Sequence, residues 1–321
     1  MPPGTRVLPR CAVTSGLTFK ASREGMRSNR PSQTSSLVTL LRALADAGLT
    51  EVSGFKDATA RPLLPPLWRL GFWYVRLRGR SAKFRQRLFG EASSGAYDTV
   101  ALRTRVLDEA WHAAHALGMR QLVLLGAGLD GRAFRLEDAS DSTVYEVDHP
   151  STQRQKRERT RRMTARALRH VFVPVNFETD SLAQALLDAG QRRDVPTFWI
   201  WEGVTPYLTR KAQEKTLTAI AECSAPGSRL AMTYTEPAPP GTVPPAIRRT
   251  AKVVRWLGEP FIGLLVREEA KALLQHAGFR LLEDTGPDTW RRKYSVRPDG
   301  LPGPLRQRIT VAELERPATG G

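Results

Sequence analysis

Short apolar runs alternate with longer stretches of three- and four-residue apolar spacing along most of the chain after Gln121. The runs are rich in β-branched and aromatic residues and predict strands, whereas the three- and four-residue spacing predicts amphipathic helices. This alternation is typical of an α/β domain with a mainly parallel sheet. The candidate strands span residues 121–126, 143–148, 171–176, 197–202, 229–235 and 279–284.

The expected helices between these strands begin after Ser or Thr caps and several end at Gly. They span residues 151–170, 179–190, 209–227 and 267–277, and the spacing upstream adds helices over 36–48 and 104–118. The N-terminal hundred residues are therefore expected to form a helical cap in front of the sheet. The last 25 residues, rich in Pro and Gly, are expected to be largely loop.

These patterns predict four segments. Residues 1–30 form a disordered basic tail, 31–110 an N-terminal helical cap or lid, 111–300 the α/β domain, and 301–321 a C-terminal tail. No apolar run reaches the roughly 18 residues that span a bilayer, and no secretory signal precedes the cap, so we expect a cytoplasmic protein without membrane contact. Cys11 and Cys223 have neither metal-site nor disulfide spacing, so no metal is expected.

The formal net charge of +17 is concentrated in three segments. Residues 61–90 carry eight basic and no acidic side chains, and 1–30 and 151–171 are also strongly basic. Clustered Lys and Arg can bind nucleic acid, so RNA modification stays an alternative, which a steep fall of affinity with salt would support.

The stretch LVLLGAGLDGRAFRL contains the spacing G-x-G-x-x-G at Gly126, Gly128 and Gly131. That spacing is a dinucleotide-binding fingerprint, which leaves an NAD-type oxidoreductase as a second alternative. Asp130 argues against a pyrophosphate, because a like-charge contact at 4 Å costs about 4 kcal/mol at an effective dielectric of about 20. A ligand with an ammonium or sulfonium and no phosphate, such as S-adenosylmethionine, suits the loop better. Asp148 can hold ribose hydroxyls in either case.

Four motifs resemble the bacterial branch of the leucine carboxyl methyltransferase-like family of class I S-adenosylmethionine-dependent methyltransferases. They are QLVLLGAGLDGRAFRL, VYEVDHPSTQRQKRER, VFVPVNFETDSLAQALLDAG and PTFWIWEGVTPYLT, in the family's order. The resemblance implies a Rossmann-like fold with a mainly parallel seven-stranded sheet, helices on both faces and an N-terminal helical cap. It also implies S-adenosylmethionine as cofactor and O-methylation of a small molecule.

The resemblance implies a role for each matching residue. Arg103 would bind the cofactor's carboxylate, Glu202 would lie near its ammonium, and Asp148 would hold the ribose. The remaining positions would line the methionyl portion or the adenine: Gly126, Ala127, Gly128, Asp130, His149, Asn176 and Phe177.

Two positions depart from the family's pattern. Asn176 stands where the family usually has Asp, which is expected to weaken or retune adenine binding. Gly131 stands where the family usually has Thr, so the third glycine is interpreted as a coincidence and Gly131→Thr is expected to keep the cofactor.

Methyl transfer from a sulfonium mainly needs a correctly placed nucleophile. No residue is identified as a catalytic base, and none of the five histidines lies in an obvious acid–base pair; Tyr207 is the candidate substrate contact.

Trp68, Trp73 and the arginines of 61–90 suggest an aromatic, cationic lid over an anionic substrate. The alternative is a half-buried helix with a solvated arginine face. The oligomeric state stays open.

Overall fold

The computed structural model describes residues 33–78, 82–177, 179–237, 261–296 and 306–315, and within residues 82–97 only the backbone. Residues 1–30, which are expected to form a basic tail, lie outside this description. So do residues 238–260, which begin with a proline-rich stretch. The described helices are α1 (Gln33–Asp46), α2 (Ala60–Leu63), α3 (Pro66–Arg78), α4 (Ala82–Ala116), α5 (Arg132–Arg135), α6 (Pro150–Thr160), α7 (Leu182–Asp188), α8 (Arg210–Glu222), α10 (Arg267–His276) and α11 (Pro287–Tyr294).

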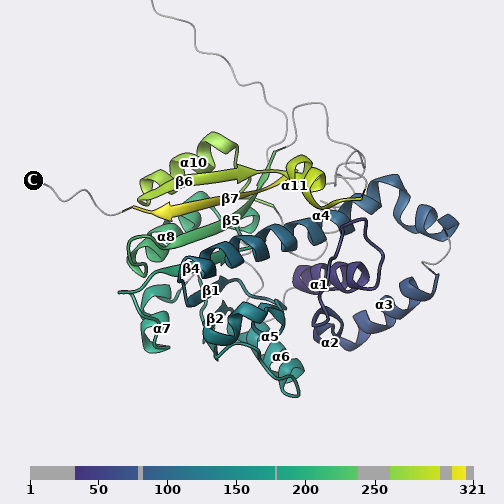
Figure 1. Cartoon of the computed structure of the whole chain (residues 1–321), viewed down its shortest axis with the longest axis horizontal. Coiled ribbons are helices and arrows are strands. Elements are labelled where there is room, and N and C mark those ends of the chain that lie inside the picture. The colour runs from purple at the N-terminus through teal and green to yellow at the C-terminus, as the bar shows by residue number, and fades with distance from the viewer. Residues whose placement is uncertain (1–32, 79–81, 178, 238–260, 297–305, 316–321) are drawn as a thin grey trace, which may run out of the picture.

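One seven-stranded sheet organises the fold, in the order β3-β2-β1-β4-β5-β7-β6 (Figure 1). Strands β1 to β5 are parallel, and β7 runs antiparallel to both of its neighbours. The strands are β1 (Gln121–Leu125), β2 (Thr143–Asp148), β3 (Arg169–Pro174), β4 (Thr197–Trp201), β5 (Arg229–Glu236), β6 (Phe279–Thr285) and β7 (Arg306–Leu314). The predicted fold, α/β with a mainly parallel seven-stranded sheet, is confirmed.

Two hydrophobic cores cover the two faces of this sheet. In β1, Leu122 and Leu124 pack with the helix α4 residue Trp111, whereas Val123 and Leu125 pack into a second core with residues of α7, α8 and α10. Alternate residues of a strand point to opposite faces, so a strand with helices on both sides is apolar throughout. All five residues of β1 are accordingly buried.

The seventh strand overturns the expectation that the C-terminal tail is largely loop. Strand β7 lies inside the sheet between β5 and β6, although it opens with the polar sequence Arg306, Gln307 and Arg308. Arg308 reaches Asp284 of β6 at 2.6 Å, and Arg306 reaches Glu236 of β5 at 3.5 Å. These cross-strand ion pairs satisfy charges that make the segment look like an exposed tail when it is read alone.

The N-terminal helices form a cap with its own small core. Helices α1, α2 and α3 bury Leu44, Leu64 and Phe72 together. Helix α4 runs without a break across residue 110, the expected boundary between cap and α/β domain, so one helix belongs to both. In Figure 1, α1 to α3 lie beside the ends of the central strands, at one side of the sheet.

Two other boundaries differ from the prediction. Helix α6 ends at Thr160 rather than near residue 170, and strand β3 begins at Arg169 rather than at residue 171. The run of arginines after Thr160 has good helix propensity, but the chain turns there to enter β3.

Candidate functional site

A cavity of about 650 Å³ lies at the carboxyl ends of β1, β2 and β4. This is where ligands bind in open α/β sheets. Every sequence-predicted site residue lines it: Arg103, Gly126, Ala127, Gly128, Asp130, Asp148, His149, Asn176, Phe177, Glu202 and Tyr207. Residues from five separate segments of the chain therefore meet at one cavity.

The turn after β1 needs glycine at positions 126 and 128. Gly126 and Gly128 have φ values of 64° and 46°, which L side chains rarely adopt. A Cβ on Gly126 would collide with the side chain of Val204, and one on Gly128 would lie 3.1 Å from the Cβ of Ser35. The turn thus exposes bare backbone to the cavity, so that a ligand can lie directly against it.

Gly131 is fixed by packing rather than by coincidence, which corrects the sequence interpretation. Its φ of −110° suits any residue, but a Cβ there would collide with Thr59 of the loop before α2. Thr59 cannot retreat easily because its Oγ1 donates to Asp57 Oδ1 at 2.5 Å. The loop that carries Thr59 can therefore approach the glycine turn closely only because Gly131 has no side chain.

We expect Gly131→Thr to lower the free energy of unfolding by about 1–3 kcal/mol, because overpacking a filled site costs that much. Urea denaturation of the variant measures it. The double variant Gly131→Thr with Thr59→Gly restores the space, and it should recover most of the loss. A single variant as stable as the parent would contradict the packing account.

Asp148, at the end of β2, contacts the glycine turn directly. One of its carboxylate oxygens accepts from Gly128 N, and the other accepts from His149 N at 2.6 Å. Burial raises the pKa of Asp148 to about 6, although the two backbone N–H groups favour the charged form. A carboxyl group in this state can accept hydrogen bonds from ligand hydroxyls at neutral pH.

His149 and Asn176 are held by local contacts beside the cavity. The Nδ1 of His149 accepts from Ser151 N at 3.2 Å, which caps the N-terminus of α6. Asn176 N donates to Asp180 Oδ2 at 2.8 Å just after β3, which fixes the turn that also carries Phe177. All three residues line the cavity.

Arg103 of α4 and Glu202 at the end of β4 form an ion pair in the cavity wall. Arg103 Nε lies 2.7 Å from Glu202 Oε1, and Arg103 Nη1 donates to Gln307 Oε1 at 3.1 Å. Burial opposes the ionisation of Glu202, but Arg103 and Arg132 outweigh it and lower its pKa. A guanidinium and a carboxylate side by side offer partners for both charges of an amino-acid zwitterion.

The sequence suggests that the Asp130 carboxylate is unpaired in the turn, but in the structure it is paired with arginine. This carboxylate lies 2.5 Å from Arg132 Nη1, and it also accepts from Arg132 N at 2.7 Å. Burial opposes its charged form, yet Arg132 and Arg42 lower the pKa of Asp130. The carboxylate is thus ionised but already neutralised by arginine.

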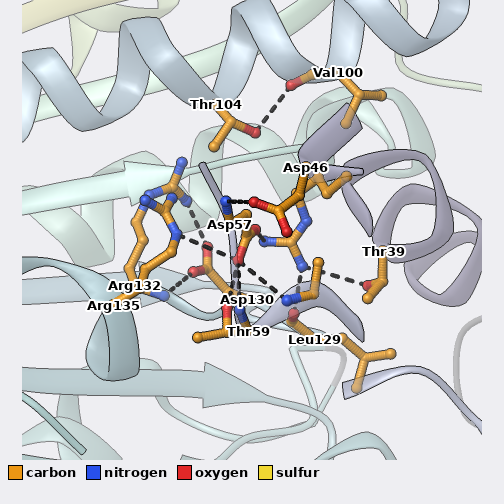
Figure 2. A network of polar contacts seen from close by, with 12 residues as sticks. Thr39, Asp46, Asp57, Thr59, Val100, Thr104, Leu129, Asp130, Arg132 and Arg135 are labelled. Carbon is orange, nitrogen blue, oxygen red and sulfur yellow. Dashed lines mark hydrogen bonds and ion pairs between the residues drawn. The ribbon is translucent and has the colours of Figure 1, made fainter. Parts of the chain in front are cut away.

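Arg132 was not predicted from the sequence and is the centre of a buried network of charges. Its side chain is 1% exposed and contacts Asp108 at 2.8 Å, Asp130 at 2.5 Å and Glu202 at 2.8 Å. Arg135 joins the network through the same Asp108, which lies 2.7 Å from its Nη1. Figure 2 shows Arg132 and Arg135 side by side, with Asp130 and Asp57 directed toward them.

Asp57 carries the network into the helical cap. It lies 3.1 Å from Arg42 of α1 and 3.7 Å from Arg135 of α5. Arg42 Nη2 in turn donates to Leu129 O at 2.6 Å, within the glycine turn (Figure 2). The cap and the turn are therefore joined through ion pairs and a backbone contact.

Helix α1 contributes cavity residues that sequence reasoning missed. Thr34, Ser35, Val38, Thr39 and Arg42 all line the cavity. Their spacing of three and four residues was a usable signal, because polar positions on one side of an otherwise apolar helix indicate a buried polar face. Arg132 offered no such signal, since Asp108 and Glu202 are distant in the sequence.

Helix α3 does not form a wall of the cavity, because none of its residues lines it. Trp73 and Tyr74 are 52% and 53% exposed, whereas Phe72 and Val75 are buried against the cap. For residues 66–78 the structure thus matches the alternative of a half-buried helix with exposed arginines. Residues 79–81 and the side chains of 82–97 lie outside the described part.

Two further findings bear on the site. Over the described ranges, no helix is long and apolar enough to cross a membrane. The ring nitrogens of His112 and His115 contact the carboxylates of Asp138 and Asp141, but neither histidine lines the cavity, and among the described lining residues His149 is the one histidine.

Comparisons with known proteins agree with the resemblance of the motifs. A chain from Mycobacterium marinum named "putative S-adenosyl-L-methionine-dependent methyltransferase" is 42% identical over 137 residues, which cover 42% of this chain and 44% of that one. A second M. marinum protein of the same name is 44% identical over 138 residues, covering 42% and 43%. The matched part thus spans less than half the length of these curated relatives.

Two solved structures share the fold. A "putative methyltransferase" from Thermobifida fusca is 19% identical, with a TM-score of 0.57 over 90% of this chain and 96% of that one. A DUF574 family protein from Streptomyces avermitilis is 16% identical, with a TM-score of 0.55 over 90% and 98%. The leucine carboxyl methyltransferase family model matches residues 35–221, more than half of the chain. The chain therefore belongs to the leucine carboxyl methyltransferase family.

Proposed function

We propose that this protein is an S-adenosylmethionine-dependent methyltransferase that methylates an oxygen atom, carboxylate or hydroxyl, of a small molecule. The observation that carries the proposal is the pairing of Arg103 with Glu202 at 2.7 Å beside the bare backbone of Gly126 and Gly128. S-adenosylmethionine ends in an amino-acid zwitterion, and its charges match those of this pair.

The other cavity residues fit the rest of the cofactor. Asp148 would accept from the ribose hydroxyls, His149 would flank the adenine, and Asn176 and Phe177 would lie along the adenine edge. Ala127 and Asp130 would complete the methionyl end. When bound, S-adenosylmethionine supplies an electrophilic methyl group on a sulfonium. The chain's own residues orient the two reactants and exclude water.

The same turn is a poor site for a pyrophosphate. A dinucleotide fold places its phosphates at the N-terminus of a helix, whose N–H groups and dipole bind them. Here the turn leads into α5, which is only four residues long, so it offers little of that dipole. The oxidoreductase alternative has no supporting observation, and neither has RNA modification.

The polar residues left over suit an anionic substrate. Lys211 and Lys215 of α8 line the cavity together with Tyr207, whereas Arg42 is already paired with Asp57. Tyr207, held in ring contact with Phe261 at 5.3 Å, would contact the substrate. A carboxylate is already ionised at neutral pH, so it can attack a methyl group without a general base. This agrees with the absence of an acid–base pair among the described lining residues.

The experiment incubates the full chain with methyl-labelled S-adenosylmethionine and panels of small carboxylic acids, phenols and alcohols, with transfer RNA as a separate arm. Mass spectrometry then locates the label. A labelled ester, which hydroxide hydrolyses, or a labelled ether, which hydroxide leaves intact, supports the proposal. Label on nitrogen, carbon or RNA would contradict it.

Tyr207→Phe should raise the KM for the accepted substrate and leave the Kd for S-adenosylmethionine unchanged.

Cofactor affinity should depend on pH through Asp148. The charged carboxylate is the form that accepts two ribose hydroxyl bonds, and its pKa is raised to about 6. As the pH falls through that value the carboxyl is protonated, so the Kd for S-adenosylmethionine should rise, by at most about tenfold per pH unit. Calorimetry across this range measures it. Asp148→Asn should bind weakly with a flat profile; a pH-independent parent would contradict the assignment.

A further inference from the structure

Helix α3 carries apolar side chains on two opposite sides. Trp68, Phe72 and Val75 face the core of the cap. Its other large apolar residues are exposed: Leu67 77%, Leu70 67%, Trp73 52%, Tyr74 53% and Leu77 78%. At about 100° per residue, these five fall within one arc of roughly 120°, opposite to the buried three.

Arginines border this exposed arc on both sides. On the same helical projection, Arg69 and Arg76 lie on one flank and Arg78 lies on the other. The guanidinium of Arg76 lies 5.2 Å from the Trp73 ring centroid, and that of Arg78 lies 5.7 Å from the Tyr74 ring centroid. Arg76 and Arg78 thus lie against aromatic rings of the strip, whereas Arg69 donates to Leu64 O at 3.0 Å and to Pro62 O at 2.6 Å.

We propose that the exposed face of α3 binds the surface of an anionic lipid membrane, with the helix lying in the plane of the interface. An interfacial helix combines a large apolar arc with Lys or Arg at its borders, and Trp and Tyr favour the headgroup level. The strip has this composition, and α3 lies at the outer margin of the cap in Figure 1.

Charge decides between the possible occupants. Residues 61–90 hold eight basic and no acidic side chains, so two copies of this face would repel one another. The chain's own residues 1–30 hold six basic side chains and one acidic one, so they are equally unsuited to cover it. An anionic lipid surface supplies the opposite charge and an apolar layer together.

The inference does not rest on the methyltransferase proposal, because α3 lines no part of the cavity. Helix α3 packs on α1, which does line it, so a membrane-bound molecule would have its cavity held close to the lipid. The proposal departs from the expectation of no membrane contact, which rested on the lack of a spanning segment, because binding at the interface requires no such segment.

The test is co-sedimentation of the full chain with vesicles. Vesicles of phosphatidylcholine mixed in equal parts with phosphatidylglycerol are compared with vesicles of phosphatidylcholine alone. We expect binding to the anionic vesicles only, weakening as salt is added. No binding to anionic vesicles at low salt would overturn the proposal.

Two variants probe the two components of the surface. Leu70→Gln with Leu77→Gln should lower the vesicle partition coefficient at least about tenfold by removing inserted apolar area. Arg76→Gln with Arg78→Gln should lower it about fivefold per arginine. The matched control is Leu117→Gln with Leu168→Gln, since these leucines are 64% and 72% exposed outside α3; it should bind as the parent does.

Other outcomes identify other occupants. Circular dichroism first establishes that each variant is folded. If light scattering shows dimers that the Leu70→Gln, Leu77→Gln variant abolishes, the face is an interface between copies and the proposal is wrong. If the control loses as much vesicle binding as the α3 variants, binding is unspecific and the proposal is equally wrong.

Discussion

Replacing Arg132 by methionine is expected to lower the free energy of unfolding by about 3–5 kcal/mol, because breaking a buried ion network leaves uncompensated charges. Arg132 is 1% exposed and contacts three carboxylates within 2.8 Å. After the substitution Glu202 keeps Arg103 and Asp108 keeps Arg135, but Asp130 loses its closest cation. Methionine has a similar volume, so a cavity contributes little.

Urea denaturation of the parent and the variant measures this effect. The matched control is Arg166→Met, since Arg166 and its partner Glu137 are both largely exposed. An exposed pair contributes at most about 1 kcal/mol, so the control should unfold almost as the parent does. A loss in Arg132→Met no greater than in the control would show that the network does not hold the turn in place.

The second large effect concerns Arg103. Arg103→Met should weaken binding of S-adenosylmethionine about 100-fold, equivalent to about 3 kcal/mol, which is the upper range for a charge-assisted hydrogen bond. The substitution removes the cation that would bind the cofactor's carboxylate, and it leaves Glu202 with Arg132 as its remaining arginine partner. Calorimetry gives the Kd directly.

Arg105 provides the control for this experiment. It lies two residues further along α4, stacks on Tyr294 at 5.3 Å and donates to Gly54 O at 3.3 Å, outside the cavity. Arg105→Met should therefore bind S-adenosylmethionine as the parent does. Equal losses in the two variants would place the effect in the stability of α4 rather than in cofactor binding.

The sheet could be predicted from the sequence because each parallel strand is an apolar run between two helices. Leu122 to Leu125 are buried on both faces, and such a run is visible without its neighbours. Strand β7 could not be found in the same way. Its arginines pair with Asp284 and Glu236 on the two adjacent strands, so its suitability for the sheet depends on partners that sequence spacing does not reveal.

The candidate site divides along the same line. Asp148 and Glu202 could be named because their motifs resemble those of the family, and their positions at strand ends agree with where ligands bind in open α/β sheets. Arg132 and Asp57 act through partners from other elements, and nothing local distinguishes them from surface charges. Gly131 was misread for the same reason, since its neighbour Thr59 is far away in the sequence.

The central claim, that the cavity is built for S-adenosylmethionine, is tested most directly by calorimetry of the full chain. Titrations use S-adenosylmethionine, S-adenosylhomocysteine and NAD in turn. The account predicts one site for each of the first two ligands and no heat of binding for NAD. Binding of NAD without binding of S-adenosylmethionine would contradict it.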